Sequence, residues 1–122
     1  MKTALRIKRV YEAPAKEDGT RVLVDRIWPR GLSKQQAAID EWMKEIAPSS
    51  ALRSWFGHDP QRWPQFHERY FKELGSSAEA VSRLAALMSD RPVTLLFAAR
   101  DTERNNAVAL AEYIALHKQQ HG

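Results

Sequence analysis

The stretch Val93-Thr94-Leu95-Leu96-Phe97-Ala98-Ala99 decides the fold class, because it is almost wholly apolar. A short apolar run of this kind predicts a strand covered on both faces, which is typical of parallel sheets. Asp101 follows and is placed to cap a final helix that runs to about Lys118. The predicted buried face of that helix consists of Ala107, Leu110, Ala111 and Ile114. A buried strand leading into a helix indicates an α/β protein.

Two further strands are predicted towards the amino terminus. Residues Leu5–Tyr11 alternate loosely between apolar and basic side chains, and Arg21–Asp25 is a short β-branched run typical of a central strand. The pair Asp18-Gly19 is a turn signal between them. After the second strand, Trp28-Pro29-Arg30-Gly31 predicts a sharp bend, since proline fixes φ and glycine restores freedom just after it.

The segment after this bend allows two predictions. Ser33 and Gln36 have the spacing of a capping box, and apolar residues at the spacing of one helix face predict a helix over Lys34–Ala47. Those apolar residues are Ile39, Trp42, Met43 and Ile46. A short strand around Trp42–Ile46 is the alternative, because Pro48 ends the segment either way.

Two helices are predicted between residues 49 and 75. The first is capped by Ser49 or Ser50 and closed by Gly57. The second starts at Asp59, which precedes a proline, and stops at Gly75. The apolar face of the second helix is formed by Trp63, Phe66, Tyr70 and Leu74.

A further helix is predicted to begin with a capping box of Ser76 and Glu79 and to end before Pro92. Its apolar face consists of Val81, Leu84, Ala85 and Met88. Short buried strands separated by helices predict one small α/β domain over residues 1–122, with a mainly parallel sheet flanked by helices.

Composition narrows the function classes. The 122 residues are 43% hydrophobic and 28% charged, as in one soluble globular domain, and the chain contains no cysteine. Thiol nucleophiles, thiolate metal sites and disulfides are therefore excluded. No run approaches the roughly 20 apolar residues of a membrane span, and the first residues lack an apolar signal core, so we expect a cytoplasmic protein. A net charge of +4 favours anionic partners.

Polar residues gather directly after two predicted strands, where parallel sheets bind their ligands. The candidates after these strands are Asp25, Arg26, Trp28 and Arg30, and then Arg100, Asp101, Asn105 and Asn106. The start of the last helix adds free N–H groups, so we expect a small anion here. A divalent ion between Asp25 and Asp101 needs no cysteine and stays open. The structural alternative is that both aspartates cap turns or pair with the arginines beside them.

A second cluster contains Arg53 and His58. Together with Arg26 and Arg30, Arg53 would form an array of guanidinium groups suited to phosphate or carboxylate. His58 is a candidate general base or ligand contact, or else an ordinary loop histidine. Trp28 is the best candidate to stack on a base, although a tryptophan that wedges the loop onto the sheet explains it equally well.

Other features favour ordinary structural roles. Trp42 and Trp63 fit helix faces and are predicted to be core residues. His117 and His121 are four residues apart and could chelate a metal, whereas a frayed C-terminal tail is the simpler interpretation. Glycine-rich phosphate loops, dinucleotide fingerprints, nucleophile elbows and zinc-protease motifs are all missing from the sequence.

Three segments together carry a resemblance to a known family. They are Asp25-Arg26-Ile27-Trp28-Pro29-Arg30-Gly31 with Lys34, the run from Ala47 through Arg53 to Pro60, and Leu95 to Asp101 with Asn105. The chain closely resembles the bacterial family called domain of unknown function 488, the YeaO-like proteins, over nearly its whole length. The resemblance implies a compact cytoplasmic α/β domain. Relatives often carry a histidine where this chain reads Arg104-Asn105-Asn106, and if that histidine were catalytic this chain would be altered or inactive.

Three functional hypotheses follow. The leading one is a small enzyme or enzyme-like domain that binds a phosphate-bearing ligand such as a nucleotide, with His58, Asp25 or Asp101 moving protons. In it, Arg26, Arg30 and Arg53 hold the anion, with Trp28 and Asn105 as further contacts. The rival is a non-enzymatic module that binds nucleic acid or a protein, and the third is a scaffolding domain whose polar motifs brace its loops.

Overall fold

The computed structural model describes the backbone of residues 5–121 and the side chains up to His117. Its centre is a four-stranded sheet in the order β1-β4-β2-β3, in which every neighbouring pair is parallel. The strands are β1 (Leu5–Arg9), β2 (Thr20–Leu23), β3 (Glu41–Trp42) and β4 (Val93–Phe97). The α/β prediction is confirmed.

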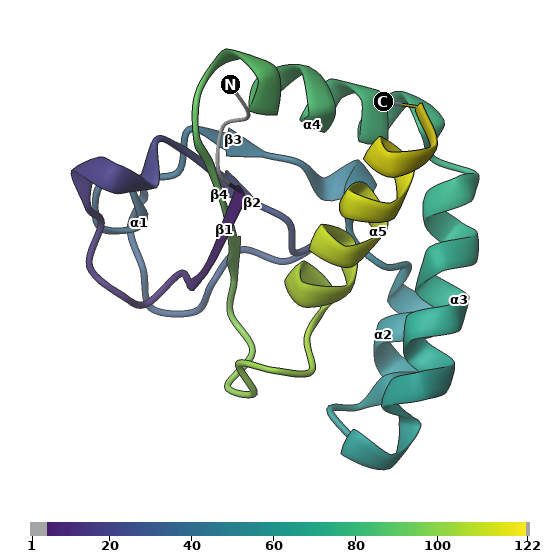
Figure 1. Ribbon diagram of the computed structural model, residues 1–122. Coiled ribbons are helices and arrows are strands. Elements are labelled where there is room, and N and C mark those ends of the chain that lie inside the picture. Colours follow the sequence, from purple (N-terminus) through teal and green to yellow (C-terminus); the bar gives the residue numbers. More distant parts are fainter. Residues whose placement is uncertain (1–4, 122) are drawn as a thin grey trace.

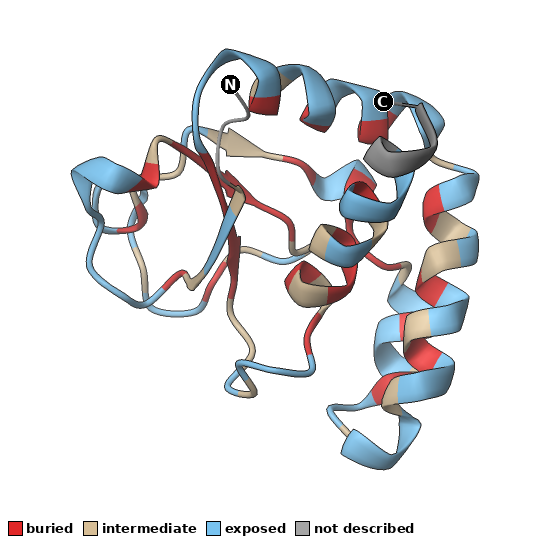
Figure 2. Ribbon diagram, viewed as in Figure 1, coloured by how far each residue is buried: buried red, intermediate tan, exposed pale blue. Residues whose placement is uncertain are grey.

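Strand β4 is the centre of the fold, and all five of its residues are buried. Its side chains alternate between two apolar clusters, because successive residues of a strand point to opposite faces. Leu95 and Phe97 join the large cluster that the helices cover, whereas Leu96 joins a smaller cluster with Val10 and Ala37. Figure 2 shows the buried strands between these two faces.

The helices are distributed unequally over the two faces (Figure 1). Helices α2 (Ser50–Phe56), α3 (Trp63–Gly75), α4 (Ala78–Asp90) and α5 (Asn106–His121) pack into the large cluster. The other face carries α1 (Lys34–Ala37) and loops. Three 3₁₀ turns complete the chain, at Lys16–Asp18, Lys44–Ile46 and Pro60–Arg62. Among the described helices, none has the length and apolar character needed to cross a membrane.

The prediction for α2 is confirmed. Helix α3 ends at Gly75 as predicted but begins at Trp63, because Asp59 caps the separate 3₁₀ turn Pro60–Arg62. Ser49 caps α2, since its hydroxyl accepts the Leu52 N–H, and Gly57 closes the helix in the left-handed region. The predicted apolar face of α3, Trp63 included, packs in or against the large cluster. Trp42 is half-buried against the smaller cluster, from a strand rather than the predicted helix face.

The helix predicted over Lys34–Ala47 is wrong beyond Ala37. Ser33 and Gln36 do form the capping box, but Ala38 adopts φ 50° and ends the helix after one turn. The cause lies outside the segment, because the buried Arg21 guanidinium donates to the carbonyls of Ala37 and Ala38. The chain then pairs Glu41–Trp42 with β2, so the alternative of a short strand is closer, although that strand ends at Trp42.

Two helix starts also differ from prediction. Helix α5 begins at Asn106 rather than after Asp101, and the Asn105 side chain accepts the Val108 N–H at 3.0 Å. Helix α4 begins after Ser77 and has no side-chain cap. In α4, Ala85 is exposed, and Leu87 packs against the core in addition to the other predicted residues. The predicted face of α5 is confirmed.

The loop between β1 and β2 is fixed by a buried ion pair. Asp18 is 2% exposed and accepts hydrogen bonds from Arg21 and Lys8. Gly19 follows with φ 63° and ψ −134° and lies directly against the Pro92 carbonyl. The Thr20 N–H donates to that carbonyl at 2.9 Å, so this turn aligns the start of β2 with the start of β4.

Candidate functional site

A cavity of about 460 Å³ lies where β2 and β4 end, which is where the fold rule for parallel sheets places a ligand. In Figure 1 this is the lower end of the sheet, where the chain leaves β4 and loops back into α5. The cavity is lined by seven of the eight predicted site residues, namely Asp25, Arg26, Trp28, Arg30, Arg53, His58 and Asn105. Three separate segments therefore meet at one site.

Asp25 occupies the centre of this site, immediately beyond β2. Its Oδ2 accepts the Ala98 N–H at 2.9 Å, and its Oδ1 accepts from Asn106 Nδ2 at 3.0 Å. The same Asn106 amide donates to the Val24 carbonyl at 2.9 Å. The carboxylate thus joins the ends of β2 and β4 to the first residue of α5.

Burial raises the pKa of the Asp25 carboxyl above its ordinary value. The hydrogen bonds from Asn106 and Ala98 act in the opposite direction, as do the charges of Arg53 and His58. Arg53 and His58 therefore lie close enough to Asp25 to stabilise its ionised form. The structure brings together the carboxylate and two of the cationic groups that the sequence suggested.

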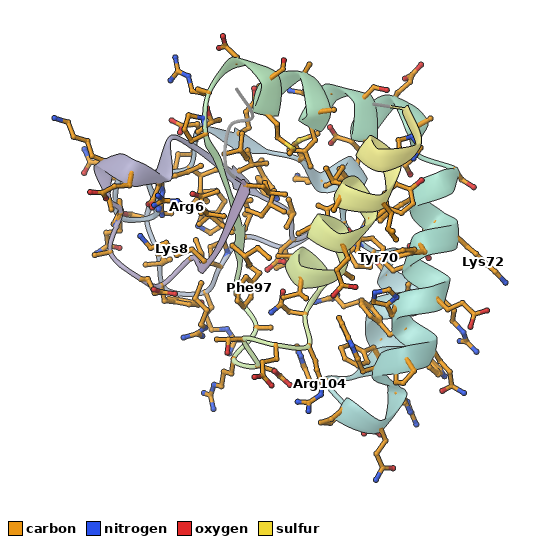
Figure 3. The ribbon with its side chains drawn as sticks, viewed as in Figure 1. Arg6, Lys8, Tyr70, Lys72, Phe97 and Arg104 are labelled. Atoms are coloured by element: carbon orange, nitrogen blue, oxygen red, sulfur yellow. The ribbon has the colours of Figure 1, made fainter. Side chains whose placement is uncertain are left out.

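The arginines differ in how far the fold already engages them. Arg26 donates to the backbone carbonyls of Pro48 and Ala47 and so braces the segment before α2. Arg30 and Arg53, in contrast, are exposed, and among the side chains of residues 5–117 their guanidinium groups make no hydrogen bond or ion pair. Arg104, labelled in Figure 3, also lines the cavity. Its guanidinium group is paired with Asp101 at 3.2 Å. Arg30 and Arg53 are the guanidinium groups available to an anion.

Trp28 has the structural role that was the alternative to stacking. Its Nε1 donates to the Leu32 carbonyl at 2.7 Å, and its ring meets Trp42 edge to face at 5.3 Å. It wedges the 28–32 loop onto the sheet while one part of it lines the cavity. His58 is exposed with φ 60° just after α2, and its ring lies 6.4 Å from that of Phe56.

Asp101 does not lie in this cavity. Its carboxylate accepts the N–H groups of Glu103 and Arg104 and pairs with the Arg104 side chain, so it caps a surface turn. Those hydrogen bonds lower the pKa of Asp101. Asn105 lines the cavity but is only 2% exposed. Its side-chain amide already makes hydrogen bonds within the fold, because it caps α5 and donates to the Asp101 carbonyl. The suggested pairing of Asp25 with Asp101 is absent from the described residues, and Asn106 takes that place.

Sequence reasoning missed Tyr11 and Arg104 in the cavity lining, and Arg9, which supports the loop after β4. Asn106 is among the candidates after the last strand, but its hydrogen bond to Asp25 depends on the start of α5, which is predicted elsewhere. Arg9 donates to the Ala98 and Ala99 carbonyls and holds the loop after β4. The Tyr11 hydroxyl donates to the Arg30 carbonyl at 2.8 Å at the mouth of the cavity. No local signal marks Arg9 or Tyr11, because their partners are remote in sequence.

A second hollow of about 500 Å³ lies on the other side of Arg26, beside α3. Two carboxylates line it: Glu45 pairs with Arg83, and Glu73 accepts from both the N–H and the hydroxyl of Ser49. Its other prominent polar group, the Tyr70 hydroxyl, is fully buried and donates to the Ile46 carbonyl at 2.6 Å. We place the site in the first cavity, because seven of the predicted site residues line it and, of these, only Arg26 also lines the second hollow.

The structure gives no metal centre among the residues it describes. Within residues 5–117, no three His, Asp or Glu side chains are grouped to hold an ion. The backbone of α5 continues to His121, whose side chain lies outside the described residues, so a chelating pair with His117 is untested.

Comparison with known proteins agrees with the resemblance noted from the motifs. The family described as the inactive DUF488-N3 subclade matches residues 4–122. The protein named Uncharacterized protein YeaO, from Escherichia coli (strain K12), is 42% identical over 110 residues, which cover 90% of this chain and 96% of that protein. Uncharacterized protein Rv3073c, from Mycobacterium tuberculosis, is 43% identical over 112 residues, covering 92% and 94%. No solved structure gives a significant match. By this match along its whole described length, the chain belongs to the DUF488 family, in the subclade described as inactive DUF488-N3.

Proposed function

We propose that this protein is an enzyme-like domain that binds a small phosphate-bearing ligand in the cavity at the ends of β2 and β4 and does not turn it over. The observation that carries the proposal is the charge of the cavity lining, which contains four arginines and one carboxylate. A cavity of about 460 Å³ is within the range of roughly 300–1,000 Å³ that small-molecule sites occupy.

Cationic side chains in the cavity are paired less fully than those elsewhere on the surface, and this difference favours an anionic ligand. Outside the cavity, several cations stand beside a carboxylate, as Lys8 does with Asp18 and Arg83 with Glu41 and Glu45. Inside it, Arg30 and Arg53 form no ion pair among the described residues, although the charge of Arg53 acts on Asp25. Like charges held together without a counterion are unfavourable, and a bound anion relieves that repulsion. The first residue of α5 also lies here, with its dipole favouring negative charge.

The absence of turnover is supported by the state of the candidate proton-transfer groups. Asp101 lies outside the cavity lining and caps a turn, and both oxygens of Asp25 already accept hydrogen bonds from the fold. The stretch 104–106 contains no histidine, and the family matched is the one described as inactive. His58 remains in the lining as a ligand contact.

The test is isothermal titration calorimetry with inorganic phosphate, pyrophosphate, ribose 5-phosphate and AMP at low and moderate salt. We expect at least one compound to bind at both salt concentrations, and Arg53→Gln to weaken it about tenfold or more, as loss of a charged hydrogen bond implies. Arg91→Gln is the matched control, because Arg91 is an exposed arginine remote from the cavity lining. The proposal fails if none of the four binds or if both variants behave alike.

Two further outcomes refine this experiment. Phosphorus NMR of the bound compound should show no product over hours, and its consumption would overturn the statement that the ligand is not turned over. A short single-stranded oligonucleotide tests the rival nucleic-acid module. Binding of the oligonucleotide alone, with affinity falling steeply as salt rises, would replace the small-ligand proposal, since such binding releases counterions in proportion to the phosphates contacted.

A further inference from the structure

We propose that the ligand carries, besides its phosphate, a pair of adjacent hydrogen-bond donors that bind both oxygens of Asp25, as the vicinal hydroxyls of a ribose or the N–H pair of a guanine-type base would. This inference rests on the proposed function and names the chemistry of the part of the ligand that does not contact the arginines.

The carboxylate of Asp25 receives fewer hydrogen bonds from the fold than it can accept. An ionised carboxylate accepts about four hydrogen bonds. Asp25 receives one on each oxygen, from Ala98 N–H and from Asn106 Nδ2. Arg53 and His58 act on it through charge, without a hydrogen bond. One accepting direction therefore remains on each oxygen, at a carboxylate that lines the cavity.

The part of a ligand that lies against the oxygens of Asp25 must be a hydrogen-bond donor. A ligand that fills the cavity displaces the water that solvates Asp25, and a buried acceptor left without a donor is unfavourable. A phosphate group at this point would set acceptor against acceptor and charge against like charge. The anionic end of the ligand must therefore lie towards Arg30 and Arg53, and the end against Asp25 must donate.

The size of the cavity and its apolar walls fit a ligand larger than a phosphate group. The cavity has room for on the order of fifteen water molecules at about 30 Å³ each, far more than inorganic phosphate displaces. Its remaining walls are largely apolar and include Phe56, Phe66 and Pro48, with Tyr11 and Ile27 exposed at the rim. A sugar or base next to the phosphate would fill this apolar space. A carboxylate that can accept one hydrogen bond on each oxygen in parallel directions favours a ligand with two adjacent donors, since such a pair binds both oxygens at once.

The test compares five ligands on the wild-type protein by calorimetry, namely inorganic phosphate, AMP, dAMP, GMP and dGMP. If the vicinal hydroxyls bind Asp25, AMP and GMP bind about tenfold or more tightly than their deoxy forms. If the base edge binds it, GMP and dGMP exceed AMP and dAMP by a similar factor. Asp25→Asn should abolish that discrimination, because an amide cannot accept on both sides, and Asp90→Asn is the matched control at an exposed carboxylate.

The outcomes separate this inference from the proposed function. Equal affinity for the four nucleotides overturns the paired-donor inference and leaves phosphate binding intact. Binding of inorganic phosphate as tightly as of any nucleotide does the same. Failure of all five ligands to bind removes both. Because the ligand series uses the wild-type protein, the inference is decided even if Asp25→Asn does not fold.

Discussion

Gly19→Ala tests whether the turn between β1 and β2 sets the alignment of the sheet. An added Cβ would lie 2.1 Å from the Pro92 carbonyl oxygen and 2.8 Å from its carbon, and both are backbone atoms that cannot rotate away. The residue also has φ 63° and ψ −134°, a conformation that only glycine adopts readily. Either the turn or the start of β4 must therefore move.

The expected loss of stability has two parts. Forcing alanine into a sparsely populated conformation costs about 1–3 kcal/mol. Displacing the Pro92 carbonyl lengthens or breaks its 2.9 Å hydrogen bond from the Thr20 N–H, which is worth about 0.5–1.5 kcal/mol. We expect a total near 3 kcal/mol, and since 1 kcal/mol corresponds to roughly 4 °C for a chain of this size, a fall in Tm of about 10 °C or more.

Gly31→Ala is the matched control. Gly31 also has a positive φ, 83°, but a Cβ there meets nothing within 4 Å. That variant should lose about 1–2 kcal/mol, from the unfavourable φ alone. The measurement is urea unfolding followed by tryptophan fluorescence. Equal midpoints for the two variants would show that the contact with Pro92 costs nothing, and the argument from close approach would be refuted.

Three further predictions concern buried polar groups. Burial raises the pKa of Asp18, but hydrogen bonds from Ala15, Lys8 and Arg21 outweigh it, so the folded pKa is lowered. The stabilising effect of ionised Asp18 is therefore present above about pH 4 and lost as pH falls, and the advantage of wild type over Asp18→Asn in urea should grow between pH 3 and pH 6. The folded pKa of Asp25 is raised, so its contribution has the opposite sign: the advantage of wild type over Asp25→Asn should shrink as pH rises above about 4, and a parallel trend for both variants would contradict the assignment. Tyr70→Phe leaves the Ile46 carbonyl without its donor and should cost about 1–3 kcal/mol, measured by urea unfolding, and an unchanged midpoint would mean that another donor replaces it.

The sheet could be predicted because its central strand has a signal of its own. Residues 93–97 are apolar without interruption, and only a strand covered on both faces accommodates that pattern. The helix signals of α2 and α3 are equally local, since Ser49, Gly57 and the apolar positions of α3 act within a few residues of one another. Such elements can be predicted because each depends on its own sequence.

The segment 34–47 could not be predicted because its structure depends on Arg21. An apolar residue every three or four positions fits a helix, yet the carbonyls that would continue the helix accept hydrogen bonds from a buried guanidinium. The Asp40 carboxylate also accepts the Arg21 N–H, which draws the chain alongside β2. The partners of these contacts are 16 to 19 residues apart in the sequence, and no pattern within residues 34–47 predicts them.

In the candidate site, too, some features could be predicted from local sequence and others depend on contacts between residues far apart in the chain. The rule that ligands bind beyond the ends of parallel strands leads to Asp25 and Asn105, whereas Arg53 and His58 reach the cavity from α2 and the turn after it. The rule does not distinguish residues that face the cavity freely from residues that hold its walls. That distinction depends on hydrogen bonds to distant carbonyls, as with Arg9 and Arg26.

This distinction determines how variants of the site should be interpreted. Arg26 and Asn105 bond the backbone on which the cavity is built, so their substitution should lower stability and binding together, as the scaffolding hypothesis also expects. The guanidinium groups of Arg30 and Arg53 make no hydrogen bond or ion pair within the described residues, so their substitution should change the midpoint of unfolding little and affect mainly binding. Loss of affinity in Arg53→Gln at unchanged stability is therefore the result that a purely structural role for the cavity does not explain, whereas equal losses in all four variants would favour it.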